Sequence, residues 1–336
     1  MTKRRLTQLK RKTPEDRKGP KVSLVLACAL ATGMALGLAF DANAYDGGRL
    51  GSFANVALRF PESWQQFRLS PPQVLAPIRI GEWPSWLFGR NEETRRKSVD
   101  DGKPVIAVVI DDLGQDQIRT KEAIALSPNV TLSFLPYPQA SHALSHEAHV
   151  AGHQVMVHLQ MQPIGDANPG PMALTAGLAP SELARRVNWA LDRVSDHDGA
   201  NNHMGSRFTA SRTALEPVMQ TLAAHRMFFL DSRTTAATQA EDVARTTGLL
   251  TGSRDVFLDD EDSASAVERQ LERTEARARA SGSAIAIGHP HPQTLAALKT
   301  WTAKLEAKGF RLVPVGQVLD RRAKAQRHPV LSSLFN

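Results

Sequence analysis

The sequence of 336 residues contains a single cysteine, Cys28, which lies inside an uncharged apolar run near the amino terminus. The rest of the chain therefore has no disulfide, no thiolate nucleophile and no cysteine-based zinc site. The glycine-rich patterns that hold nucleotide phosphates, G-x-G-x-x-G after the first strand and G-x-x-x-x-G-K-[ST], are also missing. These absences exclude thiol chemistry and leave nucleotide cofactors without support.

The body of the chain has no excess of charge of either sign. The formal charge of +7 comes from residues 1–21, which hold nine lysines and arginines against Glu15 and Asp16. The remainder is formally neutral and lacks the basic surface that binding to DNA or RNA requires. We therefore expect no nucleic-acid partner.

An apolar segment follows the basic residues directly. Residues 22–40 carry no charge and are rich in Ala, Leu and Val, and the sequence DANA ends at Ala44. This order is typical of a secretory signal peptide that is cleaved after Ala44. The run also reaches roughly 20 residues, the length of a membrane span, so an uncleaved anchor through residues 22–40 is the alternative. Both interpretations place the rest of the chain in the periplasm, because the basic flank stays inside.

Residues 45–103 lack sustained periodicity and are predicted to be a linker or spacer after the signal or anchor of residues 1–44. From Lys103 onward, short apolar runs alternate with amphipathic stretches. The runs cover 105–110, 130–135, 155–159, 227–230, 256–258, 284–287 and 311–315, and the stretches cover 116–126, 139–151, 181–195, 211–225, 237–246, 264–281 and 293–308. This alternation predicts an α/β domain over 104–322 with a parallel sheet, as a closed barrel or a doubly wound sheet, and a C-terminal tail over 323–336.

Polar residues of the types used in catalysis follow the predicted strands. They are Asp111 and Asp112 after Ile110, His158 after Val157, Asp231, Ser232 and Arg233 after Leu230, Asp259 and Asp260 after Leu258, and His289 and His291 after Ile287. The carboxyl ends of parallel strands are where α/β proteins place their active sites. These strand ends therefore predict one site at this edge of the sheet.

The tandem aspartates Asp111 and Asp112 follow a strongly apolar strand. Because neighbouring residues of a strand point in different directions, we expect one carboxylate to bind metal while the other faces substrate. The alternative is a structural role, as a helix N-cap or in a turn with Gly114, for which aspartate is a common choice. The histidines at other strand ends favour the functional interpretation.

Several histidines are candidates for metal binding and proton transfer. His158 has apolar neighbours, where a lone histidine is more often a core residue, whereas His203 lies in a polar, glycine-containing stretch that packing alone does not explain. His289 and His291 flank Pro290 directly after a buried strand, and suit the roles of ligand, acid or substrate contact. Imidazole and carboxylate donors favour zinc, with manganese or iron as alternatives.

A second group of histidines consists of His142, His146, His149 and His153. Their spacing of four, three and four residues places them on one face of a helix. A metal cluster is one interpretation. Solvated positions on an outer helix are the simpler one, since this segment precedes its strand and approaches the barrel from the end opposite to the predicted site.

Four segments together resemble the divergent polysaccharide deacetylases of the NodB-homology superfamily. They are 108–114 (VVIDDLG), 201–206 (NNHMGS), 229–233 (FLDSR) and 287–291 (IGHPH). The resemblance covers about 103–320 and implies a distorted (β/α) barrel. It also implies that Asp111 is a general base, that Asp112 binds a divalent metal and that His289 is a general acid.

The chain departs from the superfamily pattern at the second metal histidine. The resemblance aligns 152–154 (GHQ) with the lead of that motif and His158 with its first histidine, but Gln162 stands where the second should be. An Asp–His pair alone holds a divalent metal poorly. We therefore expect His203 to complete a triad with Asp112 and His158, which restores the three protein ligands of a catalytic zinc site.

The resemblance further implies a hydrolase that deacetylates a glycan of the cell envelope, with an acetylated glycan as substrate. The residues expected to contact this substrate are Arg207, Asp231, Arg233 and His291. For Arg207 and Arg233, structural pairing with Asp231 or Asp259 is an equally good interpretation. Two other functions stay open: an envelope protein that binds metal or glycan without turnover, and a metal-dependent phosphoester hydrolase.

Overall fold

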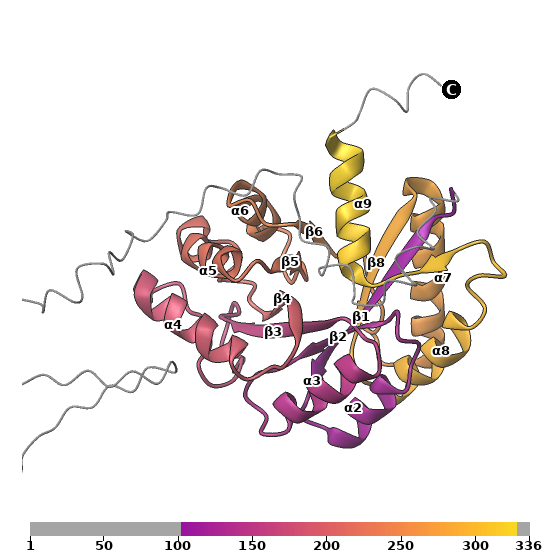
Figure 1. Ribbon diagram of the computed structural model, residues 1–336, viewed down its shortest axis with the longest axis horizontal. Helices are drawn as coiled ribbons and strands as arrows, with labels where there is room; N and C mark the ends of the chain where they lie inside the picture. Colours follow the sequence, from indigo (N-terminus) through magenta and orange to yellow (C-terminus); the bar gives the residue numbers. More distant parts are fainter. Residues whose placement is uncertain (1–101, 328–336) are drawn as a thin grey trace, which may run out of the picture. The chain divides into compact units, whose positions relative to one another are not determined.

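The computed structural model describes residues 102–327, in which strands and helices alternate through most of the chain (Figure 1). The strands are β1 (Val105–Leu113), β2 (Thr131–Phe134), β3 (Val155–Met161), β4 (His197–Met204), β5 (Phe228–Asp231), β6 (Thr251–Ser253), β7 (Val256–Phe257), β8 (Ser283–Gly288) and β9 (Arg311–Leu312). The helices are α2 (Gln117–Ile124), α3 (Ser141–Val150), α4 (Pro180–Leu191), α5 (Arg212–Ala224), α6 (Ala240–Thr246), α7 (Ala264–Ser281), α8 (Pro292–Thr302) and α9 (Val315–Arg327).

The strands form one sheet in which each ladder is parallel. Its order is β6-β5-β4-β3-β2-β1-β8-β7, and β9 pairs with the first residues of β1. β6 and β7 are the two ends of this order, yet only Arg254 and Asp255 separate them in the chain. The sheet must therefore curl until its ends meet. This arrangement confirms the predicted distorted (β/α) barrel.

Alternation along the strands divides the apolar core into two layers. On β1, Ile106 and Val108 pack in a cluster with side chains of the outer helices, whereas Ala107 and Val109 belong to a second cluster inside the barrel. Both faces of the sheet are thus buried, which is why its strands read as continuous apolar runs. Side chains that continue the inward face beyond Val109 enter the barrel interior near its carboxyl end.

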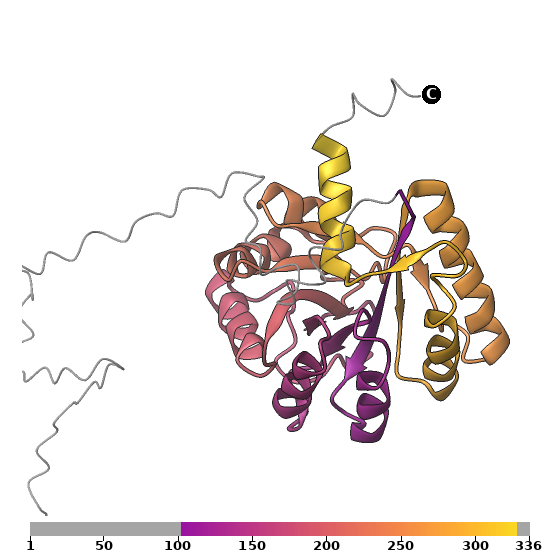
Figure 2. The ribbon, with the colours of Figure 1, turned by 45° about the vertical axis from the view of Figure 1, so that its right-hand side comes forward.

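Helix α9 closes the amino end of the barrel. Its first two backbone N–H groups donate to Thr131 Oγ1 (3.0 Å) and to Gln154 Oε1 (2.9 Å), at the amino ends of β2 and β3. Val318 and Leu319 of α9 are fully buried in the inner cluster. In both views α9, in yellow, stands apart from the outer helices (Figure 1, Figure 2). With α9 filling the amino end, the polar side chains of the barrel interior lie toward the opposite end.

The structure contains three elements that the sequence pattern does not predict: β4, β6 and α9. β4 has the polar sequence HDGANNHM, and its buried Asn201 and Asn202 find hydrogen-bond partners inside the protein. The predicted run 311–315 divides into β9 and the start of α9, and the predicted helix 293–308 ends at Thr302. These differences follow from polar side chains in a buried strand and from an apolar run shared by two elements.

The predicted signal or anchor of residues 1–44 and the spacer up to residue 101 lie outside the described residues, as does the tail after residue 327. α9 continues past residue 322, the predicted end of the domain. Within residues 102–327, none of the helices has the length and apolar character needed to cross a membrane.

Candidate active site

The two aspartates of β1 turn toward the same imidazole. The pairing of β1 with β2 shifts its register between Ile110 and Leu113, and Asp112 adopts a φ of 58°, in the left-handed region. This irregularity cancels the normal alternation of a strand. His158 Nε2 lies 3.7 Å from Asp111 Oδ2 and 3.1 Å from Asp112 Oδ1. The carboxylates of Asp111 and Asp112 thus face the same side chain, whereas strand alternation predicted that they would point to opposite sides. Their other contacts differ.

His158 lies inside the barrel. β3 continues to Met161, so His158 is within the strand rather than at its end. It shares the inward face with Met156 of the inner cluster, whereas Val157 packs outward. The side chain is 2% exposed. His158 is therefore buried like a core residue, yet both of its ring nitrogens face polar side chains.

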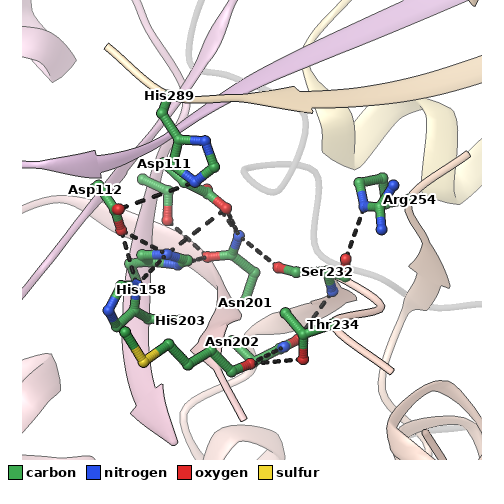
Figure 3. A network of polar contacts seen from close by, with 12 residues as sticks. Asp111, Asp112, His158, Asn201, Asn202, His203, Ser232, Thr234, Arg254 and His289 are labelled. Carbon is green, nitrogen blue, oxygen red and sulfur yellow. Dashed lines mark hydrogen bonds and ion pairs between the residues drawn. The ribbon is translucent and has the colours of Figure 1, made fainter. Parts of the chain in front are cut away.

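Asp112, His158 and His203 bring three donor atoms together from β1, β3 and β4 (Figure 3). Asp112 Oδ1 lies 3.1 Å from His158 Nε2 and 2.8 Å from His203 Nδ1, and the two nitrogens are 3.3 Å apart. Donors bound to tetrahedral zinc at about 2.0 Å are themselves about 3.3 Å apart. Asp112 Oδ1 is buried and receives no well-aligned hydrogen bond from the described residues, which a bound cation would remedy. The donor set therefore fits a divalent metal, and the ligand roles stay a prediction.

The turn after β4 holds His203 against β3. Gly205 has a φ of +91°, and a Cβ atom there would lie 2.8 Å from Met161 Cβ, so glycine is required at this close approach. Gln162, which replaces the second histidine of the superfamily motif, accepts a hydrogen bond from the backbone N–H of Ala176 (3.1 Å). The Gln162 side chain thus stabilises a loop. The third metal-compatible donor, His203, comes from β4 instead.

Asn201 is the centre of the hydrogen-bond network, although the sequence does not identify it. Its Nδ2 donates to both oxygens of Asp111 (2.8 and 3.0 Å) and to Ser232 Oγ (3.1 Å). Its Oδ1 accepts from Ser133 Oγ (2.7 Å) and from His158 Nδ1 (2.8 Å). With Nδ1 of His158 donating to Asn201, Nε2 is the nitrogen that faces Asp112 and a metal. Burial opposes a charge on this ring, but Asp111 and Asp112 raise the pKa of His158 above its ordinary value, so a metal would displace a proton from Nε2. Asn201 thus orients the Asp111 carboxylate and fixes the tautomer of His158.

The charged groups of this site alter one another's pKa values. Burial raises the pKa of Asp111 above its ordinary value, against the opposing charges of His158 and His289. Burial also acts to raise the pKa of Asp112, but His158 and His203 outweigh it and hold this pKa well below its ordinary value. Asp112 is therefore ionised at neutral pH, as a metal ligand must be, and Asp111 is the stronger base of the two.

His289 is held by Asp259 directly after β8. Asp259 Oδ2 accepts from the backbone N–H of His289 (2.6 Å) and from Thr294 Oγ1 (2.8 Å), while Oδ1 lies 3.0 Å from His289 Nδ1. The other ring nitrogen, Nε2, faces Asp112 Oδ2 at 3.9 Å. Burial disfavours the charged ring, but the hydrogen bond and charge of Asp259 raise the pKa of His289 to about 9. His289 is thus a protonated imidazole at neutral pH.

His291 lies beside His289, with the two ring centroids 5.9 Å apart. Donor atoms of Asp259, His289 and His291 lie within 4.8 Å of one another, so they form a second group that could hold a metal. The contact between His289 Nδ1 and Asp259 favours proton transfer over metal ligation at this imidazole. The prediction that His289 is a general acid is compatible with this arrangement.

The other predicted substrate contacts, Arg207, Asp231 and Arg233, lie after β4 or at or just after the end of β5. Arg207 and Arg233 expose their side chains, and neither guanidinium forms an ion pair within residues 102–327, so the predicted structural pairing is not observed there. Asp231 is buried, and its carboxylate accepts from the backbone N–H of Arg233 (2.8 Å) and from Thr238 Oγ1 (2.9 Å). These contacts favour a structural role for Asp231.

The histidines before β3 divide into two kinds: His142 and His146 are exposed on α3, as expected for an outer helix, whereas His153 lies beyond the helix and is not solvated. His153 is buried, and its ring nitrogens lie 2.8 Å from Val130 O and 2.9 Å from Ile124 O. His146, by contrast, is exposed and its Nδ1 lies 2.8 Å from Asp196 Oδ2. The two metal-compatible groups of the described chain include neither histidine. His153 therefore serves packing between α2, β2 and β3.

Replacing Asn201 with alanine is expected to lower the free energy of unfolding by about 3 kcal/mol, because a buried carboxylate and a buried imidazole lose their partner. Urea unfolding followed by circular dichroism measures this difference. Asn188→Ala is the matched control, since Asn188 is exposed on α4, and it should change the free energy by less than about 0.5 kcal/mol. Equal stability of the two variants would contradict the central role of Asn201.

Residues 108–319 match the model of the family described as divergent polysaccharide deacetylase. Uncharacterized protein YibQ of Escherichia coli K12 is 35% identical over 168 residues, which are 50% of this chain and 53% of YibQ, so the match spans about half of that relative. An uncharacterized protein of Haemophilus influenzae is 34% identical over 213 residues, 63% of this chain and 76% of the relative. The crystal structure of uncharacterized protein ATU2773 from Agrobacterium tumefaciens C58 superposes with a TM-score of 0.63 at 29% identity, covering 64% of this chain and 89% of that one. Since the family model covers more than half of the sequence, the chain belongs to the divergent polysaccharide deacetylase family.

Proposed function

We propose that the protein is a metal-dependent hydrolase that removes acetyl groups from a glycan of the cell envelope. The observation that supports this most strongly is the meeting of three metal-compatible donors with a candidate base and a candidate acid at one end of the barrel (Figure 3). Membership of a deacetylase family makes hydrolysis of an amide or ester bond the expected class of reaction. The substrate is then an acetylated sugar.

Asp112, His158 and His203 would hold the metal, and they supply the three protein ligands that a catalytic site needs. Zinc suits two imidazoles and one carboxylate best, and manganese or iron are alternatives. A divalent cation at this place supplies Lewis acidity, which polarises an acetyl carbonyl and lowers the pKa of water. The protein supplies the proton transfers.

Asp111 and His289 divide these proton transfers. Asp111 takes a proton from water as the water oxygen attacks the acetyl carbon, and its raised pKa makes it a better base near neutral pH. His289 is charged at neutral pH and gives its proton to the leaving amine or hydroxyl group. Asn201 orients the base, and Asp259 keeps the acid protonated until the bond breaks.

Asp259→Asn is expected to remove a pH-dependent part of the stability of the metal-free protein. The pKa of His289 is about 9 in the folded chain against an ordinary value of 6.5. The stabilisation by Asp259 is therefore complete below about pH 6.5 and is lost as the pH rises through about 9. Urea unfolding at intervals between about pH 6 and pH 10 should show the two stability curves converging on the alkaline side.

The neighbouring exposed Asp260 provides the control for this experiment. Asp260→Asn should follow the wild-type curve across the whole pH range. Parallel curves for wild type and Asp259→Asn up to pH 10 would show that Asp259 does not hold the proton on His289.

We also propose that the domain acts outside the cytoplasm. The support for this location is the basic, apolar and small-residue order of residues 1–44. A substrate in the cell envelope is consistent with that location. The acetylated glycan is the proposed partner, and the neutral body of the chain gives no reason to expect a nucleic acid.

A second candidate function is metal or glycan binding without turnover. Gln162 stands in place of the second histidine of the superfamily. Asp111 is 2% exposed, and Asn201 engages both of its carboxylate oxygens. A base enclosed in this way favours a protein that holds its ligand in the envelope and reacts slowly.

Metal analysis and acetate release from the full chain separate these functions. Bound metal together with acetate released from N-acetylated or O-acetylated oligosaccharides is expected for the hydrolase. Bound metal without acetate from any of them would favour the binding protein, and phosphate released from phosphoesters would favour the phosphoester hydrolase. His142→Ala, which alters an exposed histidine of α3, should leave metal content and acetate release unchanged.

A further inference from the structure

An open cavity of about 580 Å³ lies at the join between the two ends of the sheet. Every other pair of consecutive strands in the described chain is joined through a helix, whereas the connection from β6 to β7 is two residues long. This side of the barrel therefore has no connecting helix of its own. The cavity is lined by three arginines, one aspartate and two small residues: Arg233, Arg254, Arg277, Asp255, Thr235 and Ala236.

The aspartate of the lining does not neutralise these arginines. Asp255 already pairs with Arg277 (3.2 Å) and with Arg322, and it accepts the backbone N–H of Ile285 (2.8 Å). Neither Arg233 nor Arg254 forms an ion pair with a carboxylate of residues 102–327. The cavity thus has an excess of positive charge: Asp231 and Asp260 act on Arg254 from nearby, but neither forms an ion pair with it.

Arg254 is fixed in position before any ligand arrives. Its Nε donates to Ser232 O (2.8 Å) and its Nη2 to Arg233 O (3.0 Å), and its guanidinium stacks on Phe257 at 4.8 Å from the ring centroid. Burial, together with the positive charge of Arg233, lowers the pKa of Arg254. A negatively charged ligand would stabilise the charged guanidinium against both effects, and the guanidinium would lose little side-chain entropy on binding it.

The cavity is connected to the catalytic residues through two short contacts. The Phe257 ring that supports Arg254 packs on the ring of His289 with centroids 5.3 Å apart. Ser232, whose carbonyl accepts from Arg254, receives a hydrogen bond on its hydroxyl from Asn201 (Figure 3). A ligand group at Arg254 would therefore lie beside the reacting group rather than on it, as a neighbouring sugar of a glycan does.

We propose that this arginine-lined cavity binds a sugar carboxylate next to the acetylated sugar, so that the substrate is an acidic glycan. This inference rests on the proposed deacetylase function. A uronic acid and the lactyl ether of a muramic acid both carry such a carboxylate. Arginine pairs with a carboxylate through two parallel hydrogen bonds, which gives selectivity over a neutral sugar of the same size.

Calorimetric titration of the full chain tests the proposal with four probes: glucuronate, N-acetylmuramate, N-acetylglucosamine and inorganic phosphate. At least one of the two acidic sugars should bind about tenfold more tightly than neutral N-acetylglucosamine. The tighter of the two identifies the source of the carboxylate. Equal affinity for acidic and neutral sugars would overturn the proposal, as would phosphate binding that is tighter than either acidic sugar.

Variants locate the binding. Arg254→Gln and Arg233→Gln should each weaken binding of the acidic sugar about tenfold. Because Arg254 also bonds two backbone carbonyls, the exposed Arg233 is the variant that leaves folding intact. Arg269→Gln, on the exposed face of α7 outside the cavity, is the matched control. If it weakens binding as much as Arg233→Gln does, the cavity is not the site.

This measurement is independent of turnover. Loss of the preference for carboxylates overturns the cavity assignment, whether or not acetate is released. If the preference holds while no acetylated glycan releases acetate, the cavity assignment survives and the proposed deacetylase activity is wrong.

Discussion

His203→Ala is expected to remove both the bound metal and the release of acetate. Its Nδ1 lies 2.8 Å from Asp112 Oδ1 and 3.3 Å from His158 Nε2, so its loss leaves two donors where a catalytic metal needs three. We expect the affinity for zinc to fall on the order of 1000-fold. Metal content after dialysis and competition with a chelator measure this change.

The control for His203→Ala is His142→Ala, a histidine outside the site. Thermal unfolding of both variants without metal shows whether a folding defect contributes. If His203→Ala retained zinc with the affinity of the wild type, the triad would be the wrong ligand set, and the group of Asp259, His289 and His291 would become the better candidate.

Asp111→Asn is expected to lower the rate of acetate release about 1000-fold while the metal stays bound. The asparagine keeps the size of the side chain and can still accept a hydrogen bond from Asn201 on its remaining oxygen. It cannot take a proton from water. Because Asp111 is not one of the three residues of the donor set, zinc content should equal that of the wild type. Turnover and metal stoichiometry measured on the same sample check both parts.

Asp112→Asn is the variant to compare with Asp111→Asn. It makes the same isosteric substitution at the adjacent residue, but it should lose metal as well as activity. If Asp111→Asn also lost the metal, Asp111 would be a ligand rather than a base. Turnover at the wild-type rate in Asp111→Asn would remove Asp111 from the reaction altogether.

Apolar runs predicted the sheet wherever a strand is buried on both faces by aliphatic side chains. β1 and β8 coincide with the predicted runs 105–110 and 284–287 for this reason. β4 was not predicted, because its inward side chains include Asn201 and His203. β4 carries several polar side chains along its length and so lacks the apolar pattern by which strands are recognised, whereas β1 keeps an apolar run before its two aspartates.

The end of the chain shows a different limit of sequence patterns. The first turn of α9 contributes Val315 and Val318 to the inner cluster. Val315 also ends the predicted run 311–315, so one apolar pattern covers the end of β9 and the start of α9. Periodicity cannot divide such a run, because the boundary depends on what each residue contacts in the folded barrel.

The rule that sites lie at strand ends pointed to Asp111, Asp112 and His289, and also to His158, although β3 continues past it to Met161. His203 was reached only through the absence of a second motif histidine at residue 162. Asn201 could not be found, because its role depends on partners 90 residues away at Asp111 and 43 residues away at His158. Strand register and closure of the sheet decide these contacts, and spacing along the sequence does not encode them.

The distance along the chain between the three donors has a consequence for the stability of the domain. His158 and His203 are 45 residues apart, and each donor belongs to a different strand. An unfolded chain therefore offers no assembled donor set, and a cation that fits the site binds the native state alone. By mass action, each tenfold rise in free metal above the dissociation constant would add about 1.4 kcal/mol to the free energy of unfolding. The metal supply around the protein would then govern its resistance to proteolysis as well as its chemistry.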